Sequence, residues 1–109
     1  MIYVHATIEV KPGRRAEFLE EFRKIIPLVR AEQGCLEYGP AVDQLTDIPA
    51  QGDVRDEIVE VVEKWESVEA LKEHLNAPHM VAYRPKVRDM LVGLTLRIMR
   101  PTEEPSPRD

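Results

Sequence analysis

The sequence predicts a ferredoxin-like α+β fold with the element order β-α-β-β-α-β and an antiparallel four-stranded sheet. Residues 2–10 and 92–98 place aliphatic side chains at alternate positions, which is typical of strands with one buried face. Residues 18–29 instead repeat apolar side chains every three or four positions, which indicates an amphipathic helix. Two further strand-like segments, 35–42 and 58–65, lie between these elements. This order predicts a sheet that carries helices on one face only.

The first half of the chain supplies a strand, a helix and a second strand. The aliphatic face of the first strand consists of Ile2, Val4, Ala6, Ile8 and Val10. The apolar stripe of the helix consists of Phe18, Leu19, Phe22, Ile25, Ile26 and Val29. Pro27 lacks a backbone donor, so we expect a kink there, and Gly34 is expected to stop the helix. The second strand should place Leu36, Tyr38 and Val42 on one side.

The second half begins with a long loop or flap at residues 43–56, a length typical of functional or mobile segments. The third strand follows, and Ser67 is a good N-cap for the next helix. That helix has Val68, Leu71 and Leu75 on its apolar side. Asn76 is expected to cap a further short helix, kinked near Pro85, that carries Met80, Tyr83, Val87 and Met90. We expect one domain at residues 1–100 and a disordered, proline-rich tail at 101–109.

Composition excludes several classes of function. The formal net charge of −5 argues against nucleic acid, because binding to phosphates needs a basic surface. Cys35 is the single cysteine, so no intramolecular disulfide forms, which fits a reducing compartment. The first residues lack the features of a signal peptide, and no apolar run approaches the roughly 20 residues that span a bilayer. We therefore expect a cytoplasmic protein without membrane contact.

The third strand predicts a partner for the sheet. Val59 and Val61 fall on one face of this strand, whereas Ile58 and Val62 fall on the other. Because helices cover one face of the sheet only, the apolar side chains on the other face have to pack against something else. The simplest cover is a second copy of the chain, since two-fold dimers dominate soluble oligomers. We predict a homodimer packed through its sheets, with His5 at the interface.

His74 and His79 are the candidate catalytic residues. Imidazole titrates near neutral pH and can take a proton from a phenol-like hydroxyl group. The alternative for His74 is a half-exposed position on a short helix, whereas His79 beside Met80 is expected to face a cavity. A metal site is not expected, because the two histidines are five positions apart with Pro78 between them.

Aromatic and acidic side chains near the third strand are the candidate pocket residues. Trp65 either packs in the core or forms a wall against a flat substrate. Tyr38 and Tyr83 either bring hydroxyl groups to this pocket or lie at the edge of the core. Glu63 shares strand parity with Trp65, so it either reaches an apolar pocket as a base with a raised pKa or forms an ion pair at the sheet edge.

The sequence has none of the motifs that bind common redox or phosphate-bearing cofactors. It contains no glycine-rich phosphate loop, no GxGxxG and no GxSxG elbow. We therefore expect no cofactor, and any oxidation has to draw its electrons from the substrate.

Four motifs and the closing strand follow one another along the chain. The motifs are Val10-Lys11-Pro12-Gly13, Glu32-Gln33-Gly34-Cys35-Leu36-Glu37-Tyr38, Glu63-Lys64-Trp65-Glu66-Ser67 and His74-Leu75-Asn76-Ala77-Pro78-His79-Met80. In this order they resemble the antibiotic biosynthesis monooxygenase family, in particular its quinol monooxygenase branch. The resemblance implies a dimeric α+β barrel with a pocket between sheet and helices. It also implies that polycyclic phenols or quinols are oxygenated with O₂ and without metal, flavin or haem. Trp65, His74 and His79 fall at motif positions.

The leading hypothesis is a cofactor-independent quinol monooxygenase that binds a small aromatic substrate and O₂. His79 or His74 is the base in this hypothesis, and Trp65, Tyr38 and Tyr83 shape the pocket, with Glu63 and Met80 beside them.

Two alternatives are an isomerase acting on a small hydroxyketone through an enediol and a dimer that binds an aromatic metabolite without turnover. The haem-degrading branch of the same fold typically has an asparagine on the first strand. Ala6 stands at the corresponding position here, which argues against haem degradation.

Overall fold

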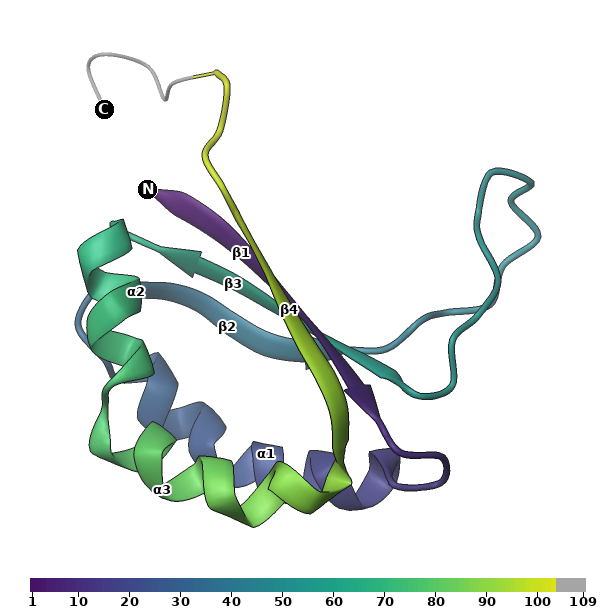
Figure 1. Cartoon of the computed structure of the whole chain (residues 1–109). Helices are drawn as coiled ribbons and strands as arrows, with labels where there is room; N and C mark the ends of the chain where they lie inside the picture. The colour runs from purple at the N-terminus through teal and green to yellow at the C-terminus, as the bar shows by residue number, and fades with distance from the viewer. Residues whose placement is uncertain (104–109) are drawn as a thin grey trace.

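The computed structural model describes residues 1–103 and confirms the predicted ferredoxin-like α+β fold. The elements in order are β1 (Ile2–Val10), α1 (Arg15–Arg30), β2 (Cys35–Ala41), β3 (Ile58–Trp65), α2 (Val68–Leu75), α3 (Pro78–Val87), the 3₁₀ helix η1 (Arg88–Met90) and β4 (Leu91–Met99). All neighbouring strands pair antiparallel in the order β2-β3-β1-β4. The second helical region is therefore split into α2, α3 and η1 (Figure 1).

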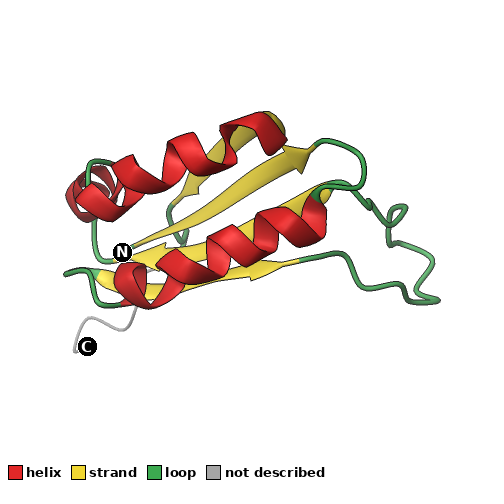
Figure 2. Ribbon diagram, turned by 90° about the horizontal axis from the view of Figure 1, so that it is seen from below, coloured by secondary structure: helices red, strands yellow, loops and turns green. Residues whose placement is uncertain are grey.

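The core lies between one face of the sheet and the helices (Figure 2). The aliphatic side chains of β1 point to this face, and Val4 and Val10 are fully buried. Pairing of β1 with β3 fixes which β3 side chains join them, because Val4 lies opposite Glu63 and Ile2 opposite Trp65. The register therefore places Glu63 and Trp65 on the helix side of the sheet.

The chain between α1 and β2 differs from the prediction in two details. The helix runs through Pro27 and ends at Arg30, so Gly34 does not stop it. Gly34 instead turns the chain into β2 with a φ of 87°, a conformation that favours glycine. A register shift between Cys35 and Glu37 then displaces Leu36, which is 47% exposed and does not share the buried side of Tyr38.

The capping residues of α2 and α3 are partly as predicted. The Ser67 hydroxyl accepts a hydrogen bond from the backbone N–H of Ala70 and caps α2. The prediction that Asn76 caps the next helix is wrong, because Asn76 ends α2 and Ala77 precedes α3. Pro78 occupies the first turn of α3, where its missing N–H costs no helical hydrogen bond.

The loop between β2 and β3 projects from the end of the sheet (Figure 1). Its base is closed by Asp43 and Arg55, whose carboxylate and guanidinium groups are 2.8 Å apart, and Arg55 also contacts Glu60. The Arg55 hydrogen bonds lower the pKa of Asp43 to about 2. These ion pairs connect the two ends of the loop.

The other face of the sheet, here called the outer face, carries no helix (Figure 2). It includes exposed His5 and Val62 and the hydrogen-bonded pair Thr7 and Glu60. Within residues 1–103, no helix is long and apolar enough to cross a membrane. The predicted disordered tail lies outside the described residues from position 104 onward.

Candidate functional site

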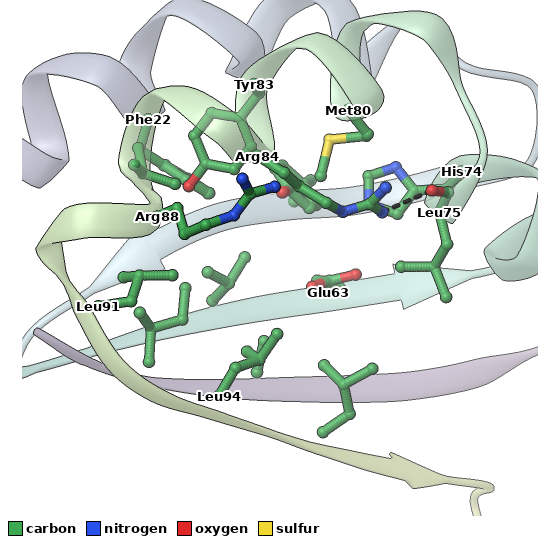
Figure 3. Close-up of a pocket in the computed structure, with 16 residues that line it drawn as sticks. Phe22, Glu63, His74, Leu75, Met80, Tyr83, Arg84, Arg88, Leu91 and Leu94 are labelled. Atoms are coloured by element: carbon green, nitrogen blue, oxygen red, sulfur yellow. Dashed lines mark hydrogen bonds between the residues drawn. The ribbon is translucent and has the colours of Figure 1, made fainter.

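A cavity of about 320 Å³ lies between the helix face of the sheet and the helices α2 and α3. Figure 3 shows Glu63 on the sheet side of this cavity, and Met80 and Tyr83 on the helix side. Most of its walls are apolar. The lining residues contributed by the strands are Ala6, Ile8, Tyr38, Val61, Glu63, Leu91, Leu94 and Leu96. Those from the helices are Phe22, His74, Leu75, Met80, Tyr83, Arg84, Val87 and Arg88.

Glu63 is a buried acid on the floor of the cavity. The indole N–H of Trp65 donates a 2.8 Å hydrogen bond to Glu63 Oε1. Burial raises the pKa of Glu63 to about 7, although the Trp65 hydrogen bond opposes this and the charge of Glu32 adds to it. Glu63 forms no ion pair within residues 1–103, so the alternative of an ion pair at the sheet edge is wrong.

His74 is a buried base in the same cavity. It is 2% exposed, so the alternative of a half-exposed position is wrong. Its ring lies 4.7 Å from the Trp65 ring and meets Tyr38 edge-on at 5.5 Å. Burial lowers the pKa of His74, against the opposing effect of Glu32, and this favours the neutral imidazole near pH 7.

Glu32 fixes the tautomer of His74. The nearest carboxylate oxygen of Glu32 is 2.9 Å from His74 Nδ1. Because a carboxylate only accepts hydrogen bonds, Nδ1 carries the proton and donates it. The lone pair of neutral His74 is then on Nε2, and His74 is one of the residues that line the cavity.

The same Glu32 oxygen also joins His79 to this cluster. It lies 2.6 Å from His79 Nε2, so one carboxylate receives N–H bonds from two imidazoles. Glu32 follows α1, His74 belongs to α2 and His79 to α3, so the cluster connects three segments. The side chain of His79 is 21% exposed, compared with 3% for that of His74. The cluster therefore reaches from the cavity to the protein surface.

The structure brings most of the predicted site residues to one cavity. Five of them line it: Tyr38, Glu63, His74, Met80 and Tyr83. Trp65 does not line the cavity, because it is fully buried behind Glu63 and His74, where it holds both. His79 does not line it either, since it lies on the far side of Glu32 in a separate surface depression.

Tyr38 and Tyr83 both line the cavity. Burial raises the pKa of both side chains far above neutrality, so each remains a protonated phenol that donates hydrogen bonds. Their rings pack around Phe22, with centroid distances of 5.7 Å to Tyr38 and 6.1 Å to Tyr83. The pair therefore suits the role of wall and hydrogen-bond donor and not that of base.

Sequence reasoning missed Glu32, Arg84 and Arg88 as site residues. Glu32 is 42 positions from His74, so no local spacing connects them. The two arginines are four positions apart, a spacing that places side chains on one helical face, and this signal was available. Among residues 1–103, no group of three or more His, Cys, Asp or Glu side chains is arranged to hold a metal ion.

Comparison with known proteins gives consistent matches over most of the chain. The family model described as antibiotic biosynthesis monooxygenase matches residues 1–86. The chain is 39% identical over 103 residues to the probable quinol monooxygenase YgiN of Escherichia coli strain K12, covering 93% of this chain and 98% of that protein. It is 31% identical over 91 residues to the putative monooxygenase YcnE of Bacillus subtilis strain 168, covering 84% and 86%. The structure of Rv0793 from Mycobacterium tuberculosis matches with a TM-score of 0.76 and 26% identity, covering 96% and 98%.

Proposed function

The chain belongs to the antibiotic biosynthesis monooxygenase family, and from this premise we propose that it oxidises a quinol with O₂. One observation carries the proposal beyond the family name. Two proton acceptors, Nε2 of His74 and the carboxylate of Glu63, border one largely apolar cavity. Oxidation of a quinol to a quinone releases two protons and two electrons, so two bases at one aromatic pocket suit this chemistry.

The proposed reaction starts with transfer of a quinol hydroxyl proton to His74 Nε2. The resulting anion is a stronger reductant than the neutral quinol, and it supplies the electrons that reduce O₂. One oxygen atom enters the ring and the other leaves as water, so quinol plus O₂ gives hydroxyquinone plus water. Glu63 accepts the second proton, and the protons held by His74 and Glu63 both go to the departing oxygen, which leaves as water. A pKa of about 7 leaves both forms of Glu63 populated near neutral pH.

The largely apolar cavity walls suit this chemistry, because a bound ring displaces water from them. Aliphatic residues from β1, β3 and β4 form its sheet side, and Phe22, Tyr38 and Tyr83 give it aromatic walls. A dry site strengthens the interaction between a base and a hydroxyl group and protects reactive oxygen intermediates from stray protons. An aromatic ring held between these walls would meet His74 in a fixed orientation, which lowers the entropic cost of proton transfer.

We assign the role of base to His74 and a supporting role to His79. The hydrogen bond from His74 Nδ1 to Glu32 holds its imidazole and directs the basic nitrogen, as an acidic partner does in other enzyme bases. His79 has no access to the cavity, but it shares Glu32 and is partly exposed. It is therefore placed to help hold Glu32 and to exchange protons with solvent.

The test is O₂ consumption by the purified protein with chemically reduced naphthoquinols, together with mass analysis for the hydroxylated quinone. We expect consumption well above autoxidation, and a loss of at least about 100-fold in kcat in His74→Gln, a typical contribution of a general base. Glu73→Gln is the matched control, because Glu73 is exposed on the same helix. No acceleration with any of several naphthoquinols and benzoquinols would refute the proposal.

We also propose that two copies pair through the outer face of the sheet. Val62 is 42% exposed on this face, which no helix covers. On it His5 lies opposite Val62 on the neighbouring strand, so a substitution at either position tests the interface. Light scattering should give twice the mass of one chain, and Val62→Glu should lower it. A monomeric mass at micromolar concentration would contradict this pairing.

A further inference from the structure

Arg84 and Arg88 are the two cations that line the cavity. Arg84 lies in the last turn of α3 and Arg88 begins η1, so the two side chains leave the chain about one helical turn apart. Figure 3 shows both side chains on the helix side of the cavity, opposite Glu63 and Leu94. The cavity thus has positive charge along one side of largely apolar walls.

Neither guanidinium has an acidic partner within residues 1–103, where no ion pair includes Arg84 or Arg88. Arg84 donates to the backbone carbonyl of Leu75, the one hydrogen bond that this guanidinium, with its five N–H donors, makes within residues 1–103. The nearest acid in sequence, Asp89, acts on Arg14 instead. Two like charges one turn apart repel each other unless an anion lies between them.

We propose that the substrate is an aromatic quinol that carries a carboxylate group, with the carboxylate bound by Arg84 and Arg88. This inference rests on the proposed quinol oxidation, which places the ring hydroxyl at His74. The apolar walls contact the ring, and the two guanidinium groups at the cavity receive the charged substituent. The planar guanidinium fork matches a carboxylate and binds it through paired hydrogen bonds.

Attraction of a carboxylate is confined to the cavity, because the rest of the protein is negatively charged overall. The chain carries a net charge of −5, so its overall field does not attract anions. Within the cavity, Glu63 is the acidic side chain and lies on the sheet side, opposite the arginines. A carboxylate at the arginines therefore keeps away from Glu63, whereas the reversed orientation would place two acids together. The charges then also select which end of the ring faces the bases.

The test compares binding of two probes that share a ring and a hydroxyl group, 1-hydroxy-2-naphthoate and its uncharged amide, 1-hydroxy-2-naphthamide. Calorimetric titration of the wild-type protein should show the naphthoate binding at least about tenfold more tightly, as charge-assisted hydrogen bonds require. Arg84→Gln/Arg88→Gln should reduce this preference to less than about twofold without weakening the amide. Arg88→Gln alone, which changes one exposed side chain, should reduce the preference partly.

Arg23→Gln is the matched control, because Arg23 lies on the surface of α1 in an ion pair with Glu20. It should keep the full preference for the naphthoate. Equal binding of both probes by the wild-type protein would overturn the inference and leave the proposed quinol oxidation standing. So would a preference that survives in the double variant. Failure of the oxidation itself would show separately, as absent O₂ consumption with neutral and with carboxylated naphthoquinols.

Discussion

The buried acid Glu63 provides the most direct quantitative test of the structure. Its pKa is about 7 in the folded protein because of burial, whereas its ordinary value is 4.5. Between these two pH values the folded state holds a proton that the unfolded state has released. The free energy of unfolding therefore falls as pH rises through this window. Replacement by the isosteric Glu63→Gln removes the ionisation and keeps a carbonyl oxygen that can accept from the indole N–H of Trp65.

The magnitude follows from the width of that window. A separation of roughly 2.5 pH units at about 1.4 kcal/mol per unit comes to about 3 kcal/mol. Near pH 4 the acid is protonated in both states, so wild type and Glu63→Gln should have similar stability. At pH 8 and above, the variant should be more stable by about 3 kcal/mol. His74 has the opposite effect, because its lowered pKa costs stability below pH 6.5, but this contribution is common to both proteins.

The assay is urea unfolding followed by far-ultraviolet circular dichroism from pH 4 to pH 9, at one fixed protein concentration. Glu73→Gln is the control, because Glu73 is exposed and its substitution should shift stability by less than about 0.5 kcal/mol at any pH. The informative quantity is the change with pH of the difference between Glu63→Gln and wild type. A difference that stays constant from pH 4 to pH 9 would refute the assignment of Glu63 as a buried acid with a raised pKa.

Three other substitutions and one control variant test the surroundings of the site. Glu32→Gln should lower the pKa of His74 further, because the carboxylate raises it, and NMR titration of the imidazole protons measures this; an unchanged pKa would contradict the contact. Trp65→Phe removes the N–H that lowers the pKa of Glu63, so the acidic limb of the kcat/KM profile should move to higher pH. Gly34→Ala should cost about 2–4 kcal/mol of unfolding free energy, since its φ is 87° and its Cβ would lie 2.6 Å from Ala70 Cβ. Gly13→Ala, with a φ of 80° but nothing within 4 Å, should cost about 1 kcal/mol, and equal losses would argue against the close approach at Gly34.

The fold could be predicted because it depends on local patterns. The alternating apolar side chains of β1 and the spacing of three and four in α1 each mark the face of the element that is buried. These two buried faces pack against each other in the core. One error occurs where pairing with another segment decides which side chains are buried. Leu36 has the spacing of a buried strand residue, but the register shift in β2 exposes it. The exposure of Leu36 depends on how β2 pairs with β3, and the residues around Leu36 give no sign of this register shift.

The site could be predicted in part for the same reason. The prediction that Glu63 and Trp65 point to the same side is correct, because residues two positions apart in one strand share a face of the sheet. Helical spacing placed Met80 and Tyr83 on one predicted helix, and the structure places both at the cavity. Glu32 has no such local signal, since its importance comes from packing the segment after α1 against α2 and α3. A residue of this kind is recognised only once the helices are placed in space.

His74 and His79 lie close together in the sequence, and their spacing alone does not show which of them reaches the cavity. The boundary between α2 and α3 separates them. His74 is in the last turn of α2, and His79 is in the first turn of α3 after the break at Ala77. Across this break, the two imidazoles contact the same carboxylate oxygen of Glu32. His74 lines the cavity and is buried from solvent, and this burial lowers its pKa and favours the neutral imidazole. His79 keeps contact with solvent, so the hydrogen bonds of Glu32 connect His74 at the cavity with a partly exposed side chain.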